Sequence, residues 1–359
     1  MTKKWSSRLT FFAFVVLMVG LGSNDSLRGI FSTIFQEHFS LTTTQLGLIV
    51  TASYIGNLVF LLVGGNLSTR FSKKRVLQVL ILIWMAALAL FAFTSNYTVL
   101  LIGMALALGS STLLNTTMNL ITPLLFATAP GFFVNFLFFT QEIGTSGSQY
   151  ILGSHADGFA FWQHTNLVLL ILGAVAFVLL LFCNVPEEAA DPADTPAQKG
   201  GYDWRIIVPY VLVFGFYFIA EHGVMNWRVA YGVDGLGLPQ ASAAKYLSVF
   251  FGGMMIGRLC LSPLVDKLGA LKSLAAFGGV SCVLYLIGSL GGAVTMPVWA
   301  ISGLSFSILY PTLVMSIRLY FPAQQVSGAA GTILSIASLA DILFNVGFGK
   351  LVDMAGYAV

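Results

Sequence analysis

Four carboxylic side chains stand inside long apolar segments of this 359-residue chain, namely Asp25, Glu142, Glu221 and Asp341. An ionised group in such a segment costs about 3 kcal/mol on insertion scales and marks a functional site by default. A carboxylate buried without a full countercharge can take up and release a proton near neutral pH. We therefore expect these four residues to carry proton coupling. The alternative is that they only join helices through hydrogen bonds.

The neighbours of these carboxylates change the expectation for three of them. Arg28 follows Asp25 at a spacing of three on one helical face, so Asp25 is either permanently neutralised or a proton carrier. Glu221 has no basic residue three or four positions away, which favours titration over pairing, and its chain neighbour His222 points elsewhere on a helix. Asp341 stands nearer the outer end of its segment and is alternatively a half-exposed helix cap.

Uncharged polar side chains supply a second kind of chemistry. A spacing of three to four places Thr112, Asn115 and Asn119 on one helical face, which suits hydrogen bonding to a polyhydroxyl solute. Gly20 and Gly22 precede a polar run and predict either a locally broken first helix, whose freed backbone groups bind solute, or close packing. Our candidate solute site, with packing as the alternative for each member, consists of Asn24, Arg28, Thr112, Asn115, Asn119, Gln141, Trp227 and Tyr310.

The segments that must position these residues are membrane-spanning helices. The chain is 57% hydrophobic and 9% charged, with a mean hydropathy of +0.88, which is far outside the range of soluble domains. A bilayer core of about 30 Å needs roughly 20 apolar residues per helix, and continuous rather than alternating apolar runs exclude a barrel. We predict an all-α membrane protein with spans near residues 9–35, 42–65, 76–94, 97–127, 131–152, 165–183, 206–230, 242–264, 272–291, 296–321 and 325–348.

A polar run between Asn184 and Trp204 divides the chain. It is rich in acidic residues, proline and glycine, which predicts a flexible linker. An offset of 197 residues superposes the first span on the seventh, so we expect a parallel repeat with an N-terminal six-helix half at 1–184, a cytoplasmic linker at 185–204 and a C-terminal half at 205–359. The sixth span finds no counterpart at this offset. Helix 12 is apparently missing, which gives 6+5 spans as written, and we expect a shortened sequence rather than a natural eleven-helix protein.

Basic residues near the span ends set the orientation, because basic loops stay in the cytoplasm. With the N-terminus inside, 13 of the 17 basic residues lie on the cytoplasmic side, and the others are Arg28, Arg228, Lys245 and Lys350. We predict an integral protein of the bacterial inner (plasma) membrane with a cytoplasmic N-terminus. The three cysteines lie in or beside spans, and we expect no disulfide.

Two turns at equivalent positions carry a family pattern. The turn after the second span reads GNLSTRFSKKR (65–75), and the turn after the eighth reads SPLVDKLGALK (262–272). Both resemble the loop motif of the major facilitator superfamily, although Thr69 and Ser72 replace the aspartate and glycine of that motif in the first copy, which puts its usual gating salt bridge in doubt. The resemblance implies gating roles for Arg70, Arg75, Asp266, Lys267 and Arg258.

Shorter stretches are similar to the fucose:proton symporter branch of that superfamily. They are FGGMMIGRL (251–259), GLSFSILYPT (303–312) and the pair Glu221 and Trp227. The superfamily resemblance implies two six-helix halves in which the first, second, fourth and fifth helices of each half face a central cavity. Fucose symporters carry a carboxylate beside an asparagine in the fourth helix, and this chain has none there, so their substrate and proton site are not carried over.

The sequence thus predicts a secondary active transporter that moves a small polar solute, such as a sugar, by proton-coupled alternating access. A proton-driven exporter of drugs or other amphipathic compounds is the transport alternative, and a non-transporting membrane receptor or scaffold is the alternative from another class. The chain has no P-loop pattern, no metal-ligand spacing and no motif that joins a nucleophile to a base. We expect no enzymatic activity, no cofactor, no metal and no nucleic acid, but a monomer that interacts with its solute, protons and membrane lipids.

Overall fold

The computed structural model describes the chain except for residues 1–2, 127–129, 187–202, 318, 322 and 358–359. The described part is helical throughout and holds no strand. The elements are α1 (Lys3–Ile30), α2 (Ser32–Phe39), α3 (Thr43–Arg70), α4 (Lys73–Phe93), α5 (Tyr97–Leu125), α6 (Pro130–Ile151), α7 (Phe159–Leu181), α8 (Trp204–Ala230), η1 (Tyr231–Gly235), α9 (Gln240–Leu268), α10 (Ala270–Leu290), η2 (Gly292–Thr295), α11 (Met296–Ile301), α12 (Gly303–Phe306), α13 (Leu309–Ile317) and α14 (Ala323–Ala355).

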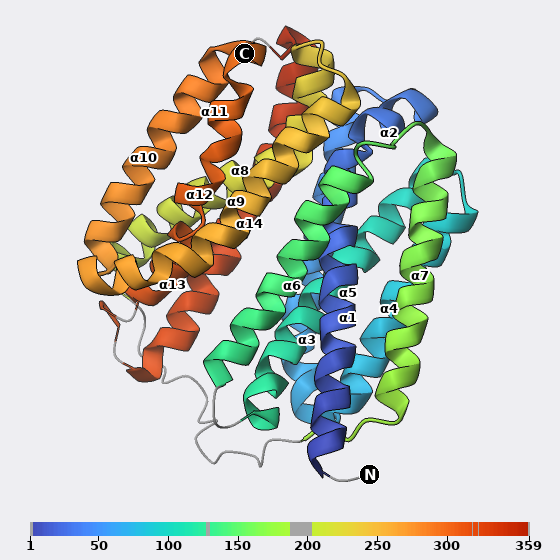
Figure 1. The fold of residues 1–359 in the computed structure, drawn as a ribbon, viewed down its shortest axis with the longest axis vertical. Coiled ribbons are helices and arrows are strands. Elements are labelled where there is room, and N and C mark those ends of the chain that lie inside the picture. The colour runs from blue at the N-terminus through green and yellow to red at the C-terminus, as the bar shows by residue number, and fades with distance from the viewer. Residues whose placement is uncertain (1–2, 127–129, 187–202, 318, 322, 358–359) are drawn as a thin grey trace.

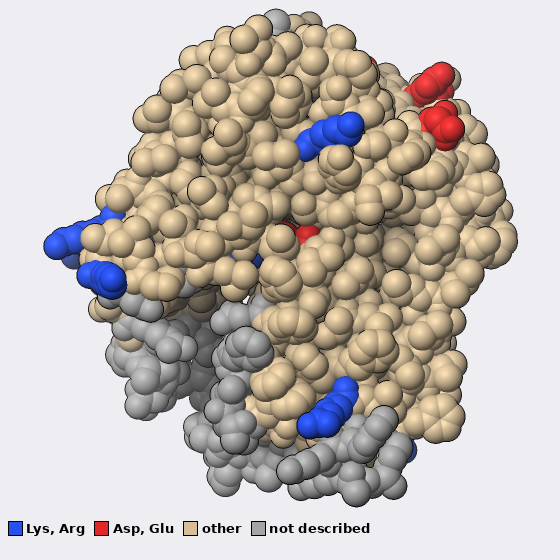
Figure 2. All heavy atoms as spheres, in the orientation of Figure 1, with Lys and Arg blue, Asp and Glu red and all other residues tan. Residues whose placement is uncertain are grey.

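The expected all-α membrane fold is confirmed. Within the described residues, nine helical segments are long and apolar enough to cross a membrane. The molecular face in Figure 2 is largely uncharged, with only scattered Lys, Arg, Asp and Glu side chains, as a lipid-facing surface requires. The division into 6+5 spans stays a prediction, and most of the expected linker, residues 187–202, lies outside the described residues.

The first span differs from its prediction. The expected break near Gly20 and Gly22 is wrong, because α1 runs without interruption to Ile30 and the chain breaks only at Phe31. Gly22 instead allows close packing, since a methyl group there would overlap the carbonyl oxygen of Gln141 in α6. The expected tenth span, in contrast, is interrupted and forms α11, α12 and α13 in succession.

Figure 1 shows two groups of helices side by side, which we call the N-terminal bundle (α1–α7) and the C-terminal bundle (α8–α14). Their buried apolar side chains form two main clusters, one within residues 13–185 joined by Trp227 and one within residues 207–337. The bundles meet where α1 packs on α8, α3 on α14 and α6 on α9. These three helix pairs position the four predicted carboxylates, Asp25, Glu142, Glu221 and Asp341, whereas α5 and α13 position Thr112, Asn115, Asn119 and Tyr310.

We name the two ends of the molecule after Lys3, where α1 begins, and Asp353, near the end of α14. At the Asp353 end, the Asp353 carboxylate accepts hydrogen bonds from the backbone N–H groups of Thr43 and Thr44 at 2.6 and 2.7 Å. It therefore caps the N-terminus of α3, which belongs to the other bundle. Nearby, Gln240 of α9 donates a hydrogen bond to the carbonyl oxygen of Ile30. These contacts join the bundles at the Asp353 end.

The outer surface of the C-terminal bundle carries an apolar groove of about 840 Å³ between α8, α10 and α13. Tyr210, Phe216 and Leu274 are among its lining residues. In the N-terminal bundle, α7 packs on α1 and α4, the counterparts of α8 and α10 at the 197-residue offset. Among the described residues of the C-terminal bundle, α9 and α13 contact both α8 and α10.

Candidate functional site

Two carboxylates and one guanidinium meet between the bundles. Arg258 of α9 donates from Nη1 to Oε1 of Glu142 in α6 at 2.6 Å, and its Nη2 lies 4.0 Å from Oε1 of Glu221 in α8. All three side chains are partly buried, and each comes from a position away from the ends of its helix. The Glu142–Arg258 contact crosses from one bundle to the other, whereas the Arg258–Glu221 contact lies within the C-terminal bundle. We call these three residues the central ion network.

The central ion network corrects two expectations. Glu221 was expected to lack a basic partner, but that reasoning covered only its own helix, and α9 brings Arg258 to it. Arg258 was expected at the cytoplasmic side, yet it follows the start of α9 by eighteen residues and reaches carboxylates in the interior of α6 and α8. A buried guanidinium is costly without an anion, so the two carboxylates account for its position.

Three amide side chains form a hydrogen-bonded ladder between α5 and α6. Asn115 of α5 donates from Nδ2 to Oε1 of Gln141 at 2.7 Å, and Asn119 donates to Oδ1 of Asn115 at 2.6 Å. Asn115 and Asn119 lie one helical turn apart, and Gln141 directly precedes Glu142 in α6. The structure thus brings together three of the predicted solute ligands, Asn115, Asn119 and Gln141.

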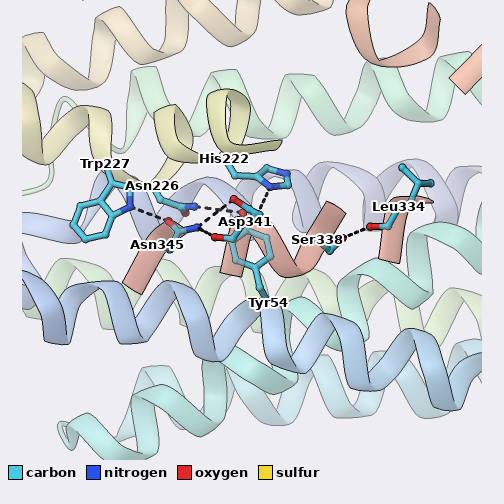
Figure 3. Close-up of polar contacts among 8 residues, drawn as sticks. All are labelled: Tyr54, His222, Asn226, Trp227, Leu334, Ser338, Asp341 and Asn345. Carbon is cyan, nitrogen blue, oxygen red and sulfur yellow. Dashed lines mark hydrogen bonds and ion pairs between the residues drawn. The ribbon is translucent and has the colours of Figure 1, made fainter. Parts of the chain in front are cut away.

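A second polar cluster lies where α3, α8 and α14 meet (Figure 3). His222 donates from Nδ1 to Oδ2 of Asp341 at 2.6 Å, and Asn345 donates to Oδ1 of Asp341 at 3.3 Å. Trp227 donates from Nε1 to Oδ1 of Asn345 at 2.8 Å. Asp341 is 1% exposed, so the alternative of a half-exposed helix cap is wrong.

Tyr54 extends this cluster into the N-terminal bundle. Its hydroxyl accepts a hydrogen bond from Nδ2 of Asn226 at 3.3 Å, and its ring stacks on His222 with 5.0 Å between the ring centroids. The guanidinium carbon of Arg28 lies 5.7 Å from the Tyr54 ring centroid. Asp25, three residues before Arg28, forms no ion pair within 4.0 Å with any described basic residue, and its Oδ1 has no hydrogen-bond partner there. We call Tyr54, His222, Asn226, Trp227, Asp341 and Asn345 the His222 cluster.

Three further predicted solute ligands form no hydrogen bond with either group among the described residues. Asn24 is buried and accepts a hydrogen bond from Nε1 of Trp84 in α4, which is the packing alternative. Tyr310 packs on Tyr217 and Phe218 in the aromatic core of the C-terminal bundle. Thr112 is half-buried on α5.

The structure describes three of the five predicted gating side chains, and one of them, Arg258, belongs to the central ion network. Arg75 and Lys267 are exposed, and the side chains of Arg70 and Asp266 lie outside the described residues. Next to Arg75 at the start of α4, Lys74 donates hydrogen bonds to the carbonyl oxygens of Leu181 and Cys183 at the end of α7. This contact stabilises the N-terminal bundle alone, so the gating role stays a prediction.

Sequence reasoning missed four members of the His222 cluster, which are Tyr54, His222, Asn226 and Asn345. A signal for three of them was present, because His222 and Asn226 are four apart, as are Asp341 and Asn345. No sequence spacing could show that these two faces meet. In the part of the chain that can be inspected, no group of three His, Cys, Asp or Glu side chains is arranged to hold a metal ion.

Comparisons with known proteins agree with this architecture. The family model of the Major Facilitator Superfamily matches residues 10–345. The L-fucose-proton symporter of Escherichia coli is 24% identical over 333 residues, covering 80% of this chain and 75% of that protein. A glucose/galactose transporter of Brucella abortus is 26% identical over 341 residues, covering 89% and 81%. The solved structure of the E. coli xylose transporter XylE superposes with a TM-score of 0.78 at 15% identity, covering 97% of this chain and 91% of that one.

Proposed function

The chain belongs to the major facilitator superfamily, and we propose that it is a proton-coupled transporter of a sugar or a related small polar solute. The relatives named as a fucose-proton symporter and a glucose/galactose transporter support this class of solute. The observation that carries the proposal is the central ion network, because it joins the two bundles through a titratable group. We further propose that the protein acts as a monomer in a bacterial inner membrane, with the Lys3 end in the cytoplasm.

The amide ladder supports a neutral, hydrogen-bonding solute. Asn115, Asn119 and Gln141 offer both donors and acceptors at one place, as a sugar hydroxyl requires. The surrounding charges do not favour an anion. Asp25, Glu142, Glu221 and Asp341 outnumber the two guanidinium groups of Arg28 and Arg258.

The central ion network suggests how a proton would act. Protonation of Glu142 removes the negative charge that holds Arg258 across the bundle interface. Arg258 then keeps Glu221 as its partner within the C-terminal bundle, so the guanidinium does not lose all compensation. The bundles lose an ion pair while each remains intact, which is the change that alternating access needs.

The conformation described here is closed at the Asp353 end by the contacts of Asp353 and Gln240. We propose that the opposite conformation closes the Lys3 end instead, where Arg70, Arg75, Asp266 and Lys267 would meet. The basic residues of that end support its cytoplasmic placement.

Proton movement on addition of solute tests the proposal. The purified protein is reconstituted into liposomes in a weakly buffered medium, and L-fucose, D-glucose or D-galactose is added outside while the external pH is recorded. Symport predicts an alkaline shift of the medium with at least one sugar, abolished by a protonophore. If none of the sugars shifts the pH but amphipathic cations are extruded under a proton gradient, the exporter replaces this proposal. Binding without any flux would indicate a receptor.

A further inference from the structure

A histidine outside the central ion network lies between the two bundles. The ring of His222 stacks on Tyr54 of α3 with 5.0 Å between ring centroids, and its Nδ1 contacts Asp341 of α14 (Figure 3). The same ring also stacks on Phe218 of its own helix, with 5.4 Å between ring centroids. Asp341 is itself fixed by Asn345. The imidazole is therefore held in one place by side chains from three helices.

This geometry leaves one ring nitrogen of His222 able to accept a proton. Because an ionised carboxylate only accepts hydrogen bonds, the contact with Asp341 places the ring hydrogen on Nδ1 and the lone pair on Nε2. Nε2 makes no hydrogen bond to any described residue, and the side chain is 26% exposed, against 2% for Asp341. A proton can bind at Nε2 and turn the neutral imidazole beside Asp341 into an imidazolium–carboxylate ion pair without moving a heavy atom.

The groups around His222 would compensate that charge. One guanidinium, three carboxylates and one phenol surround the His222 ring. They come from helices packed against α8 and from residue 221, the chain neighbour of His222. These groups are Arg28 and Asp25 of α1, Tyr54 of α3, Asp341 of α14 and Glu221 of α8.

We propose that His222 is a second proton-binding residue and that its protonation holds α3 against α8 and α14, which favours closure of the Asp353 end. A protonated imidazole attracts both the Asp341 carboxylate and the face of the Tyr54 ring. Loss of the proton removes the cation–π attraction to Tyr54 and leaves only the hydrogen bond of the neutral ring to Asp341. Since Tyr54 belongs to the N-terminal bundle and His222 to the C-terminal bundle, the proton acts on the contact between bundles.

In transport, which rests on the proposed function, this residue would sense the proton from the side that the Asp353 end faces. A proton that enters while the Asp353 end is open binds Nε2 and favours closure. Release toward the Lys3 end weakens the contact of Tyr54 with His222 and lets the Asp353 end reopen. The role of His222 in conformation does not depend on which solute is carried.

Two measurements on the full chain test the proposal. Histidine-selective ¹³C NMR follows the four histidines from pH 5 to 9, and His222→Gln identifies the signal of His222. Spin labels at Phe93→Cys of α4 and Met354→Cys of α14, which are 73% and 77% exposed, report the separation of the bundles at the Asp353 end. Cys183, Cys260 and Cys282 are replaced by serine so that only these two positions carry labels. His164→Gln, an exposed histidine on α7, is the matched control.

We expect the His222 signal to titrate, and the fraction of molecules open at the Asp353 end to rise with pH at the same midpoint. A tenfold difference in proton affinity between the two conformations would change their ratio by up to about tenfold. This component should disappear in His222→Gln and persist in His164→Gln. An unchanged pH response in His222→Gln overturns the proposal. Should that variant not fold, a wild-type spectrum in which all four histidine signals match exposed histidine, with no change in label distance, overturns it as well.

The result is separable from the fate of the proposed function. Loss of the pH response in His222→Gln supports the switch even if no sugar moves protons in liposomes. If sugars do move protons and the His222→Gln response equals that of the wild type, the switch alone is refuted.

Discussion

Replacing Asp353 by alanine should shift the molecule away from the conformation described here. The carboxylate lies near the C-terminal end of α14, where the helix dipole disfavours a negative charge. Asp353 therefore does not stabilise its own helix. It instead accepts the N–H groups of Thr43 and Thr44 and the Thr44 hydroxyl at 2.6, 2.7 and 2.5 Å. A lost N-cap costs about 1 kcal/mol, and about 2 kcal/mol at most. Because Asp353 and α3 belong to different bundles, that free energy stabilises only the conformation closed at this end.

A change of 1 kcal/mol corresponds to about a fivefold shift in the ratio of the two conformations, and 2 kcal/mol to about thirtyfold. The label pair at positions 93 and 354 measures this ratio directly. Asp203→Ala is the matched control, because Asp203 caps α8 within its own bundle by accepting the N–H of Arg205 at 2.9 Å. An equal shift in both variants, or no shift in Asp353→Ala, would refute the view that this cap joins the bundles.

Three further predictions concern the central ion network, the amide ladder and Asp25. Arg258→Gln should lower the melting temperature, because it leaves Glu142 and Glu221 without a countercharge, and adding Glu142→Gln should restore part of the loss. If the single and the double variant are equally destabilised, the ion pair between Arg258 and Glu142 is refuted. Asn115→Ala should weaken sugar binding by about tenfold, since it leaves Gln141 and Asn119 without their partner, whereas Thr116→Val, whose hydroxyl bonds only to its own helix, should leave binding unchanged in a thermal-shift titration. Asp25→Asn should fold well and lose proton-driven transport if Asp25 is a carrier; poor folding that Arg28→Gln repairs would make the two a structural pair.

The helices were predictable from the sequence because each depends on local composition. The apolar runs gave most spans to within a few residues, for example 76–94 against α4 at Lys73–Phe93. The break after Ile30 and the interruptions between α11 and α13 were not foreseen. At Gly22, local chemistry allowed both a break and close packing, and the carbonyl oxygen of Gln141 in α6 explains why packing prevails.

The site was only partly predictable because its contacts join helices that are distant in the chain. The four carboxylates stood out by the cost of burying charge, and Asn115 and Asn119 by helical spacing. The partners of those groups did not, since Arg258 is 116 residues from Glu142 and His222 is 119 residues from Asp341. Spacing along one helix shows which residues share a face. Which face of another helix packs against it depends on the fold of the whole chain.

Gradient-driven accumulation and solute exchange, measured side by side in liposomes for the wild type and Glu142→Gln, test the central ion network most directly. Glutamine fixes the neutral form of residue 142, and Glu221 remains to compensate Arg258. The account predicts that Glu142→Gln exchanges L-fucose, D-glucose or D-galactose between loaded compartments within about twofold of the wild-type rate but no longer accumulates it under an imposed proton gradient. Accumulation equal to that of the wild type, or loss of exchange and accumulation together, would contradict it.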